Sequence, residues 1–263
     1  MKYKGEYKMV FAARTHTGRI RKNNEDCFYI PGPLSCVSVT PSALPSNVMI
    51  IADGMGGHAA GEVASQTAVA EALRALAEIG EGNTVDALKT AVMTANGQIY
   101  AMSRGRITLR GMGTTLTVAV LYRKELYIGH VGDSRAYLFD KDKLIQLTKD
   151  HTFVANLVAN GCIKPEEVTT HPHRNVITRA VGTHAKVEPD VIRCSWSEGN
   201  ILLLCSDGLT EYMIDEDILR VLSSRSSLKK KVDDLVRLSL SRGGADNITA
   251  VAALNMEAGG NKV

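Results

Sequence analysis

The sequence is poor in several features that mark specialised protein classes. Aromatic residues make up only 5% of the 263 residues, with a single Trp, so we expect no aromatic-rich binding face. No apolar run approaches the roughly 18 residues that a membrane-spanning helix needs. The first residues carry Lys and Glu where a signal peptide has its apolar stretch. We therefore expect no membrane association.

Cysteine is also scarce and irregularly placed. The five cysteines are odd in number and none falls in a C-x-x-C pattern: Cys27, Cys36, Cys162, Cys194 and Cys205. This pattern argues against a disulfide framework and against a thiolate zinc site. The cytoplasm is the predicted location.

The sequence also lacks a large excess of either positive or negative charge. Lys and Arg number 31 against 28 Asp and Glu, which leaves a net charge of +3 and gives no reason to expect a nucleic-acid partner. With 44% hydrophobic and 22% charged residues, the composition is that of an ordinary globular protein. We expect one domain over residues 1–254 and a disordered tail over 255–263.

The hydrophobic patterns alternate between strands and helices. Apolar positions spaced by three and four predict helices at 62–79, 84–102, 153–159, 215–222 and 228–240. Short apolar, β-branched runs predict strands at 8–14, 27–30, 48–52, 115–121, 125–131, 135–139, 143–147, 201–205 and 248–254. Tight turns between the four runs from 115 to 147 favour an antiparallel meander, and the class is α+β.

Two segments interrupt this order. Residues 31–47 hold four of the seven prolines and predict a loop or an edge excursion. Residues 148–190 are rich in His, Gly and Pro, with one short helix pattern, and are a candidate for a flap that faces the substrate.

Acidic residues recur at the ends of the predicted strands. Five such positions are Asp26, Asp53, Asp133, Asp207 and Asp246, and Glu25 adjoins the first of them. If these strand ends converge, several carboxylates share one small volume, which is unfavourable unless a cation neutralises them. Each residue taken singly could equally be a solvated turn residue, because Asp and Gly dominate turns.

The ligand type indicates which cation. Oxygen ligands without His or Cys at matching spacing favour Mg²⁺ or Mn²⁺ over zinc. Two such ions sharing one carboxylate would generate a bound hydroxide for in-line attack at phosphorus.

Six short motifs occur in the order typical of one family: RKNNED at 21–26, ADGMGG at 52–57, GMGTT at 111–115, GDSR at 132–135, SDGL at 206–209 and DNIT at 246–249. Over residues 8–254 the chain resembles the metal-dependent protein phosphatases (PPM, type 2C), most of all the bacterial serine/threonine phosphatases. The resemblance implies a central antiparallel β-sandwich flanked by helices on both faces, in four α-β-β-α layers.

The resemblance also implies a function. It is hydrolysis of phosphoserine and phosphothreonine in proteins by direct attack of a metal-bridging hydroxide, without a phosphoenzyme. Phosphorylated proteins would be the substrates, and the chain would oppose a Ser/Thr kinase that acts on the same targets. It would act as a monomer.

The resemblance assigns roles residue by residue. Asp53 is similar to the carboxylate that bridges two Mn²⁺ or Mg²⁺ ions, with the Gly54 carbonyl on one of them. Asp207 and Asp246 match ligands of the first ion, and Asp133 matches a ligand of a weaker third ion shared with Asp207. Glu25 and Asp26 match the acidic pair of the second ion, and either of them could coordinate it directly. Arg21 matches the arginine that receives the substrate phosphate.

The chain departs from the family pattern at two places. Met55 occupies the position where some members carry a histidine proposed as general acid. His58, three residues on, and metal-bound water are the two alternatives for protonating the leaving group. The excursion at 31–47 is longer than in a compact bacterial member.

Parts of the sequence are also compatible with three other interpretations. His151, His171 and His173 could bind zinc, but no nearby Cys or carboxylate completes the spacing, which favours loop histidines that form hydrogen bonds. Gly54, Gly56 and Gly57 suggest a dinucleotide site, although Ala59 replaces the third glycine and Asp53 would repel a pyrophosphate. A phosphatase-like binding module without catalysis is the third alternative.

Overall fold

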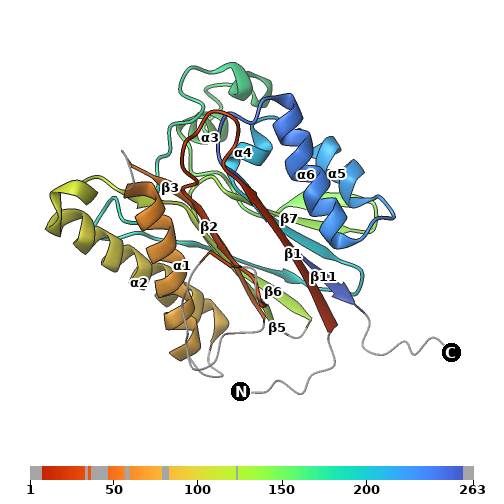
Figure 1. Ribbon diagram of the computed structural model, residues 1–263, viewed down its shortest axis with the longest axis horizontal. Helices are drawn as coiled ribbons and strands as arrows, with labels where there is room; N and C mark the ends of the chain where they lie inside the picture. Colours follow the sequence, from red (N-terminus) through yellow and green to blue (C-terminus); the bar gives the residue numbers. More distant parts are fainter. Residues whose placement is uncertain are drawn as a thin grey trace.

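The computed structural model describes residues 8–32, 35–36, 47–56, 60–78, 83–122 and 124–256. Two antiparallel sheets form the centre of the molecule (Figure 1). The helices are α1 (Ala60–Glu78), α2 (Thr84–Gly105), α3 (Phe153–Ala159), α4 (Asp207–Thr210), α5 (Asp215–Leu222) and α6 (Leu228–Arg242), with 3₁₀ turns η1 (Ile107–Leu109) and η2 (Pro165–Thr170). The strands are β1 (Lys8–His16), β2 (Asp26–Tyr29), β3 (Val48–Met55), β4 (Gly113–Thr114), β5 (Leu116–Tyr122), β6 (Glu125–Val131), β7 (Arg135–Asp140), β8 (Lys143–Gln146), β9 (Asp190–Ser195), β10 (Ile201–Cys205) and β11 (Ile248–Met256).

Each sheet is covered by its own pair of helices. One sheet has the order β2-β3-β5-β6-β9 with β4 paired to β3, and the other has the order β1-β11-β10-β7-β8. Helices α1 and α2 lie outside the first sheet, and α5 and α6 lie outside the second (Figure 1). This arrangement confirms the predicted α+β fold with four layers.

Three apolar clusters fill the spaces between the layers. The cluster under α1 and α2 uses many small residues, such as Ala64, Ala68 and Ala72, which repeat every four positions and let α1 approach its sheet closely. A second cluster lies between the two sheets, where Trp196 is almost fully buried. A third joins the other sheet to α5 and α6. Burial on both faces therefore fixes the two sheets rigidly behind the strand ends.

The predicted meander from 115 to 147 is wrong in its topology. β5 pairs with β6 and β7 pairs with β8, but the two hairpins belong to different sheets. The chain crosses between the sheets at residues 132–134, where Gly132 has φ +116°. A Cβ at this position would lie 2.6 Å from Cβ of Thr115, so only glycine fits the crossing. The crossing places Asp133 at the end of the sandwich.

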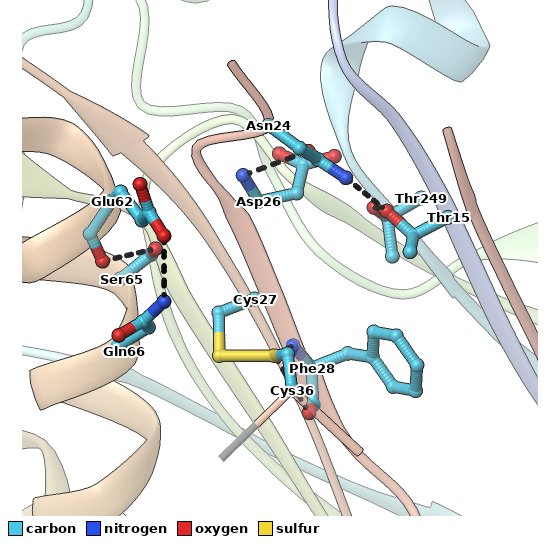
Figure 2. Close-up of a disulfide and its surroundings, with 10 residues drawn as sticks. All are labelled: Thr15, Asn24, Asp26, Cys27, Phe28, Cys36, Glu62, Ser65, Gln66 and Thr249. Carbon is cyan, nitrogen blue, oxygen red and sulfur yellow. Dashed lines mark hydrogen bonds between the residues drawn. A yellow bond between two sulfur atoms is a disulfide. The ribbon is translucent and has the colours of Figure 1, made fainter. Parts of the chain in front are cut away.

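The cysteine pattern argued against a disulfide framework, yet one disulfide is present. Cys27 of β2 forms a disulfide with Cys36, and the bond lies next to Asp26 (Figure 2). The excursion is thus tied to the strand that it follows, and Tyr29 also forms an isolated bridge with Ser35. Most of residues 31–47 lies outside the described part of the chain.

Several predicted boundaries shift by a few residues. β3 continues through Asp53 and Gly54 to Met55 because β4 extends the ladder. β11 includes Asn255 and Met256, which the sequence assigned to the tail, because these residues pair with Met9 and Lys8 of β1. Ile79 and Gly80, the predicted end of the first helix, lie outside the described residues. None of the helices described is long and apolar enough to cross a membrane.

Candidate active site

The predicted carboxylates come from both sheets and gather at one end of the sandwich. Asp26 of β2 and Asp53 of β3 are register partners in the first sheet. Asp207 lies two residues after β10, as the first residue of α4, and Asp246 lies two residues before β11; β10 and β11 pair in the second sheet. The loop between β1 and β2, together with α3 and α4, lies at this same end, at the top of Figure 1.

Burial raises the pKa of these carboxylates, and their mutual charge raises it further. Desolvation raises the pKa of Asp26 to about 7, with Asp207 and Asp246 adding to the shift. The pKa of Asp53 lies well above its usual value, because of desolvation first and then the charge of Asp26. Desolvation, followed by the charge of Asp246, raises the pKa of Asp207 to about 6. The sandwich end therefore holds more negative charge than it can keep without a cation.

Arg21 is a positively charged side chain that contacts this cluster directly. Its Nη2 donates to Oδ2 of Asp246 at 2.7 Å, while 56% of its side chain stays exposed. The pKa of Arg21 is raised, chiefly by this hydrogen bond and further by Glu25 and Asp53. Arg21 is thus oriented by a carboxylate and still has guanidinium surface free for an anion.

Glu25 packs against two glycines. The Gly54 backbone N–H donates to the Glu25 carbonyl at 3.1 Å. A Cβ on Gly61, in the first turn of α1, would lie 2.6 Å from Oε2 of Glu25, so the helix must present a glycine there. Desolvation raises the pKa of Glu25. The strand end and the helix start thus position this carboxylate together.

Polar side chains that the sequence motifs did not single out hold the carboxylates in place. Asn247 accepts from the Glu25 N–H at 2.7 Å and donates to the carbonyls of Thr17 and Asn23, both at 2.9 Å. Ser206 donates to Oδ2 of Asp26 at 2.8 Å. Their sequence position could have indicated both residues, because each directly adjoins a predicted ligand in its motif.

Asp133 is joined to this site through Thr115 and Ser134. The Thr115 hydroxyl lies 2.8 Å from the Ser134 hydroxyl and accepts from the Asp53 N–H at 2.8 Å. Desolvation, followed by the charge of Asp207, raises the pKa of Asp133 to about 8. Asp133 and Asp207 also line one cavity of about 650 Å³, whose other walls include α3 and η2.

The residues present fit divalent cations bound through oxygen. Within the described residues, buried Oδ1 of Asp26 and Oδ1 of Asp207 have no hydrogen-bond partner. No three His, Cys, Asp or Glu side chains in the described ranges form a ready-made metal-binding group. Mg²⁺ keeps several waters and takes only one or two carboxylates from a protein, so such a site does not need a closed cage.

The comparisons with known proteins agree with this geometry. The profile of the Protein phosphatase 2C family matches residues 38–251. The chain belongs to this family. It is 41% identical over 247 residues to the serine/threonine protein phosphatase PstP of Mycobacterium tuberculosis, covering 92% of this chain and 44% of PstP. It is 37% identical to the serine/threonine phosphatase stp of Listeria innocua, covering 90% of this chain and 92% of that protein.

Solved structures share the whole fold. A crystal structure of PstP from M. tuberculosis has a TM-score of 0.84 at 40% identity and covers 95% of this chain and 99% of that one. A second structure, the PstP catalytic domain with two manganese ions, has a TM-score of 0.82 at 39% identity, with the same coverage. The chain spans 44% of the length of the curated PstP proteins, which are thus much longer than it is.

Among the 2C-family assignments, the structure brings together Arg21, Glu25, Asp26, Asp53, Gly54, Asp133, Asp207 and Asp246 at one end of the sandwich. Their individual roles stay predictions. His58, one alternative for the general acid, and Gly57 lie outside the described residues. Met55 ends β3, where it pairs with Gly113.

The other interpretations lose support. His151 is engaged by Gly132 and Asp190, whereas the His171 ring accepts from the His173 N–H, so these are loop histidines in hydrogen bonds. Gly54 lies within a strand, where a Cβ would meet the Gly61 carbonyl at 2.1 Å. Close packing against α1 therefore explains this glycine without a dinucleotide.

Proposed function

We propose that this chain hydrolyses phosphoserine and phosphothreonine in proteins, with Mn²⁺ or Mg²⁺ as its cofactor. The observation that carries the proposal is the cluster of desolvated carboxylates beside a partly exposed arginine. Family membership supports the reaction class, and the manganese-bound relative supports two ions in the main site. A third, weaker ion would use Asp133 and Asp207.

The chain's own residues would hold the cations and the substrate. Asp53 would contact both ions, with Asp207, Asp246 and the Gly54 carbonyl on one side and the Glu25–Asp26 pair on the other. Bound divalent cations supply a polarised phosphoryl group and a water of lowered pKa. Arg21 would receive the phosphate, because its planar fork offers two parallel hydrogen bonds to phosphate oxygens. Asp246 keeps that fork oriented.

The substrate protein would lie along the cavity that starts at Asp133 and Asp207. Residues 148–190 supply α3 and η2 as one of its walls, which supports their assignment as a flap beside the site. Phosphoproteins that a Ser/Thr kinase modifies are the natural substrates. We further propose that the chain acts as a monomer.

The cytoplasm remains the proposed location. The Cys27–Cys36 disulfide argues against it, because the cytosol keeps most protein thiols reduced. Trapping free thiols in cells before lysis distinguishes a reducing from an oxidising compartment. Cys36 should be alkylated if the chain resides in a reducing compartment.

Hydrolysis of p-nitrophenyl phosphate and of a phosphothreonine peptide, with and without Mn²⁺, tests the proposal. We expect turnover only with Mn²⁺, and its loss in Asp53→Ala. Asp142→Asn, in the exposed turn between β7 and β8, is the matched control. A well-folded protein without metal-dependent turnover would instead be the binding module considered above, and near-normal turnover of Asp53→Ala at saturating Mn²⁺ would disprove the site assignment.

A further inference from the structure

His151 is a buried histidine that binds both backbone polar groups of Gly132. Only 6% of its side chain is exposed, and it lies between β8 and α3, at the start of the flap. Its backbone N–H donates to the Gly132 carbonyl at 2.8 Å, and its Nδ1 accepts from the Gly132 N–H at 3.0 Å. Gly132 immediately precedes Asp133, so one residue, through its backbone and its ring, holds the start of the crossing that carries this carboxylate.

The contacts of the ring fix its tautomer. Because the Gly132 N–H can only donate, Nδ1 must accept, and the ring proton is therefore on Nε2. Nε2 faces Oδ2 of Asp190 at 3.2 Å, and Oδ1 of Asp190 accepts from Arg179 at 2.6 Å. Burial lowers the pKa of His151, which keeps the ring neutral as this arrangement requires.

The ring is also held from one face. His130 packs against it with 4.9 Å between the ring centroids. His130 is itself fixed by Thr117, at 2.9 Å, and by the Lys149 carbonyl, at 3.2 Å. The His151 ring consequently has little freedom to turn its Nδ1 away from Gly132.

The other side of the crossing has separate anchors. Ser134 is hydrogen-bonded to Thr115, and Arg135 donates to both carboxylate oxygens of Asp150, with the Nη2–Oδ2 contact at 2.6 Å. Asp133 therefore lies between two fixed points. The anchor at Ser134 is shared with Asp53, whereas the anchor at Gly132 comes from His151.

We propose that His151 is a positioning residue that fixes Asp133 beside Asp207 and couples this placement to the flap through Asp190 and Arg179. The functional part of this inference rests on the proposed phosphatase activity. His151 reaches no reacting atom and acts only through the backbone of Gly132. Asp190 and Arg179 belong to the end of the flap, so a displaced flap end would release the orienting acceptor of the ring.

Two substitutions separate the contacts of the ring. In His151→Asn the amide oxygen takes the place of Nδ1 and can still accept from Gly132, but the side chain is too short to reach Asp190. In His151→Gln the amide reaches toward Asp190 and the acceptor for Gly132 is lost. Asp190→Ala removes the orienting carboxylate at a half-exposed position without touching Gly132. His184→Asn, an exposed histidine of the flap, is the matched control.

Hydrogen exchange of the Gly132 amide in the metal-free protein is the first measurement. Loss of one hydrogen bond should speed this exchange about three- to tenfold in His151→Gln, and by less in Asp190→Ala. His184→Asn should exchange as the parent does. His151→Asn, which keeps the acceptor for Gly132 but loses the contact with Asp190, should exchange no faster than Asp190→Ala. In Mn²⁺, kcat for p-nitrophenyl phosphate should fall in His151→Gln and be retained in His151→Asn, with KM unchanged in both.

Equal exchange in the Asn and Gln variants would overturn the positioning role, and unchanged exchange in Asp190→Ala would overturn the coupling to the flap. Because exchange is measured without metal, the prediction for exchange can fail while the phosphatase assay succeeds, and the reverse also holds. The two proposals are therefore tested separately.

Discussion

Asp26 and Asp53 lie directly opposite each other across the antiparallel β2–β3 ladder, so both carboxylates point to the same side of the sheet. Like charges in such a pair are destabilising, and here both are also desolvated. The pair connects the sequence motif of the β1–β2 loop with that of β3. It is the structural reason to expect a cation between them.

The metal-free protein should lose stability as the pH rises. The pKa values of Asp207, Asp26 and Asp133 are raised to about 6, 7 and 8, above the value of about 3.9 of an unfolded Asp. The folded state therefore binds more protons, and this stabilisation is complete below about pH 4 and lost as the pH rises through 6 to 8. We expect Tm in EDTA to fall by roughly 5–10 °C between pH 5 and 8.5.

The control for this experiment is built into the site. Asp133→Asn should flatten the dependence of Tm on pH, and Asp142→Asn should leave it unchanged. A Tm that stays level or rises over this range would contradict the raised pKa values.

Metal binding should release protons near neutral pH. Carboxylates that are protonated in the metal-free protein must ionise before they coordinate a cation. Titration calorimetry with Mn²⁺ at pH 6.5, in two buffers of different ionisation enthalpy, should show release of about one proton or more. The release should disappear near pH 9, and equal heats in both buffers at pH 6.5 would disprove the coupling.

Arg21→Lys should raise KM for a phosphopeptide about tenfold or more, with a smaller effect on kcat, because lysine keeps the charge but loses the two-pronged contact. Arg21→Ala should raise KM further. Arg237→Lys on α6, an exposed arginine near Asp234, is the matched control. An unchanged KM in Arg21→Ala would remove Arg21 from the phosphate site.

Asn247→Ala should destabilise the fold by about 2–4 kcal/mol, since it removes three hydrogen bonds of a buried side chain. It should also raise KM, because Asn247 ties the loop of Arg21 to the strand that follows Asp246. Urea unfolding and steady-state kinetics measure the two effects. Asn247→Asp, which keeps only the acceptor for the Glu25 N–H, should recover part of the stability.

Cys36→Ser should lower the unfolding free energy by about 2.5 kcal/mol under oxidising conditions, as expected for a short loop closed by a disulfide. The same loss should follow addition of a reductant to the parent protein. Cys162→Ser, at an exposed free cysteine, should have no effect. Equal stability of parent and Cys36→Ser would show that the bond does not contribute.

The sequence was sufficient to predict the layers and the converging carboxylates. Helix α3 and strands β6 and β10 have the predicted bounds, because each carries a strong local pattern with a clear stop. The acidic positions were visible because each adjoins a buried strand. The order of their motifs along the chain resembles one family, and this resemblance implied that the acidic residues share one site. Their spacing in the sequence alone does not show this.

Long-range pairing explains what was missed. Nothing local shows that β6 and β7 belong to different sheets, since a hairpin turn and a crossing between sheets both use Gly and Asp. The Cys27–Cys36 disulfide depends on how the excursion folds back on β2. Asn247, Ser206 and His151 act through partners between 19 and 230 residues away, which one sequence does not reveal.

Anomalous scattering from crystals soaked in Mn²⁺ tests the central claim most directly. We predict two strong peaks on either side of Asp53, one beside Asp207 and Asp246 and one beside Glu25 and Asp26, with a weaker third near Asp133. Asp53→Ala crystals should lose the two strong peaks. Manganese bound elsewhere on the molecule, or none at this end of the sandwich at saturating concentration, would contradict the account.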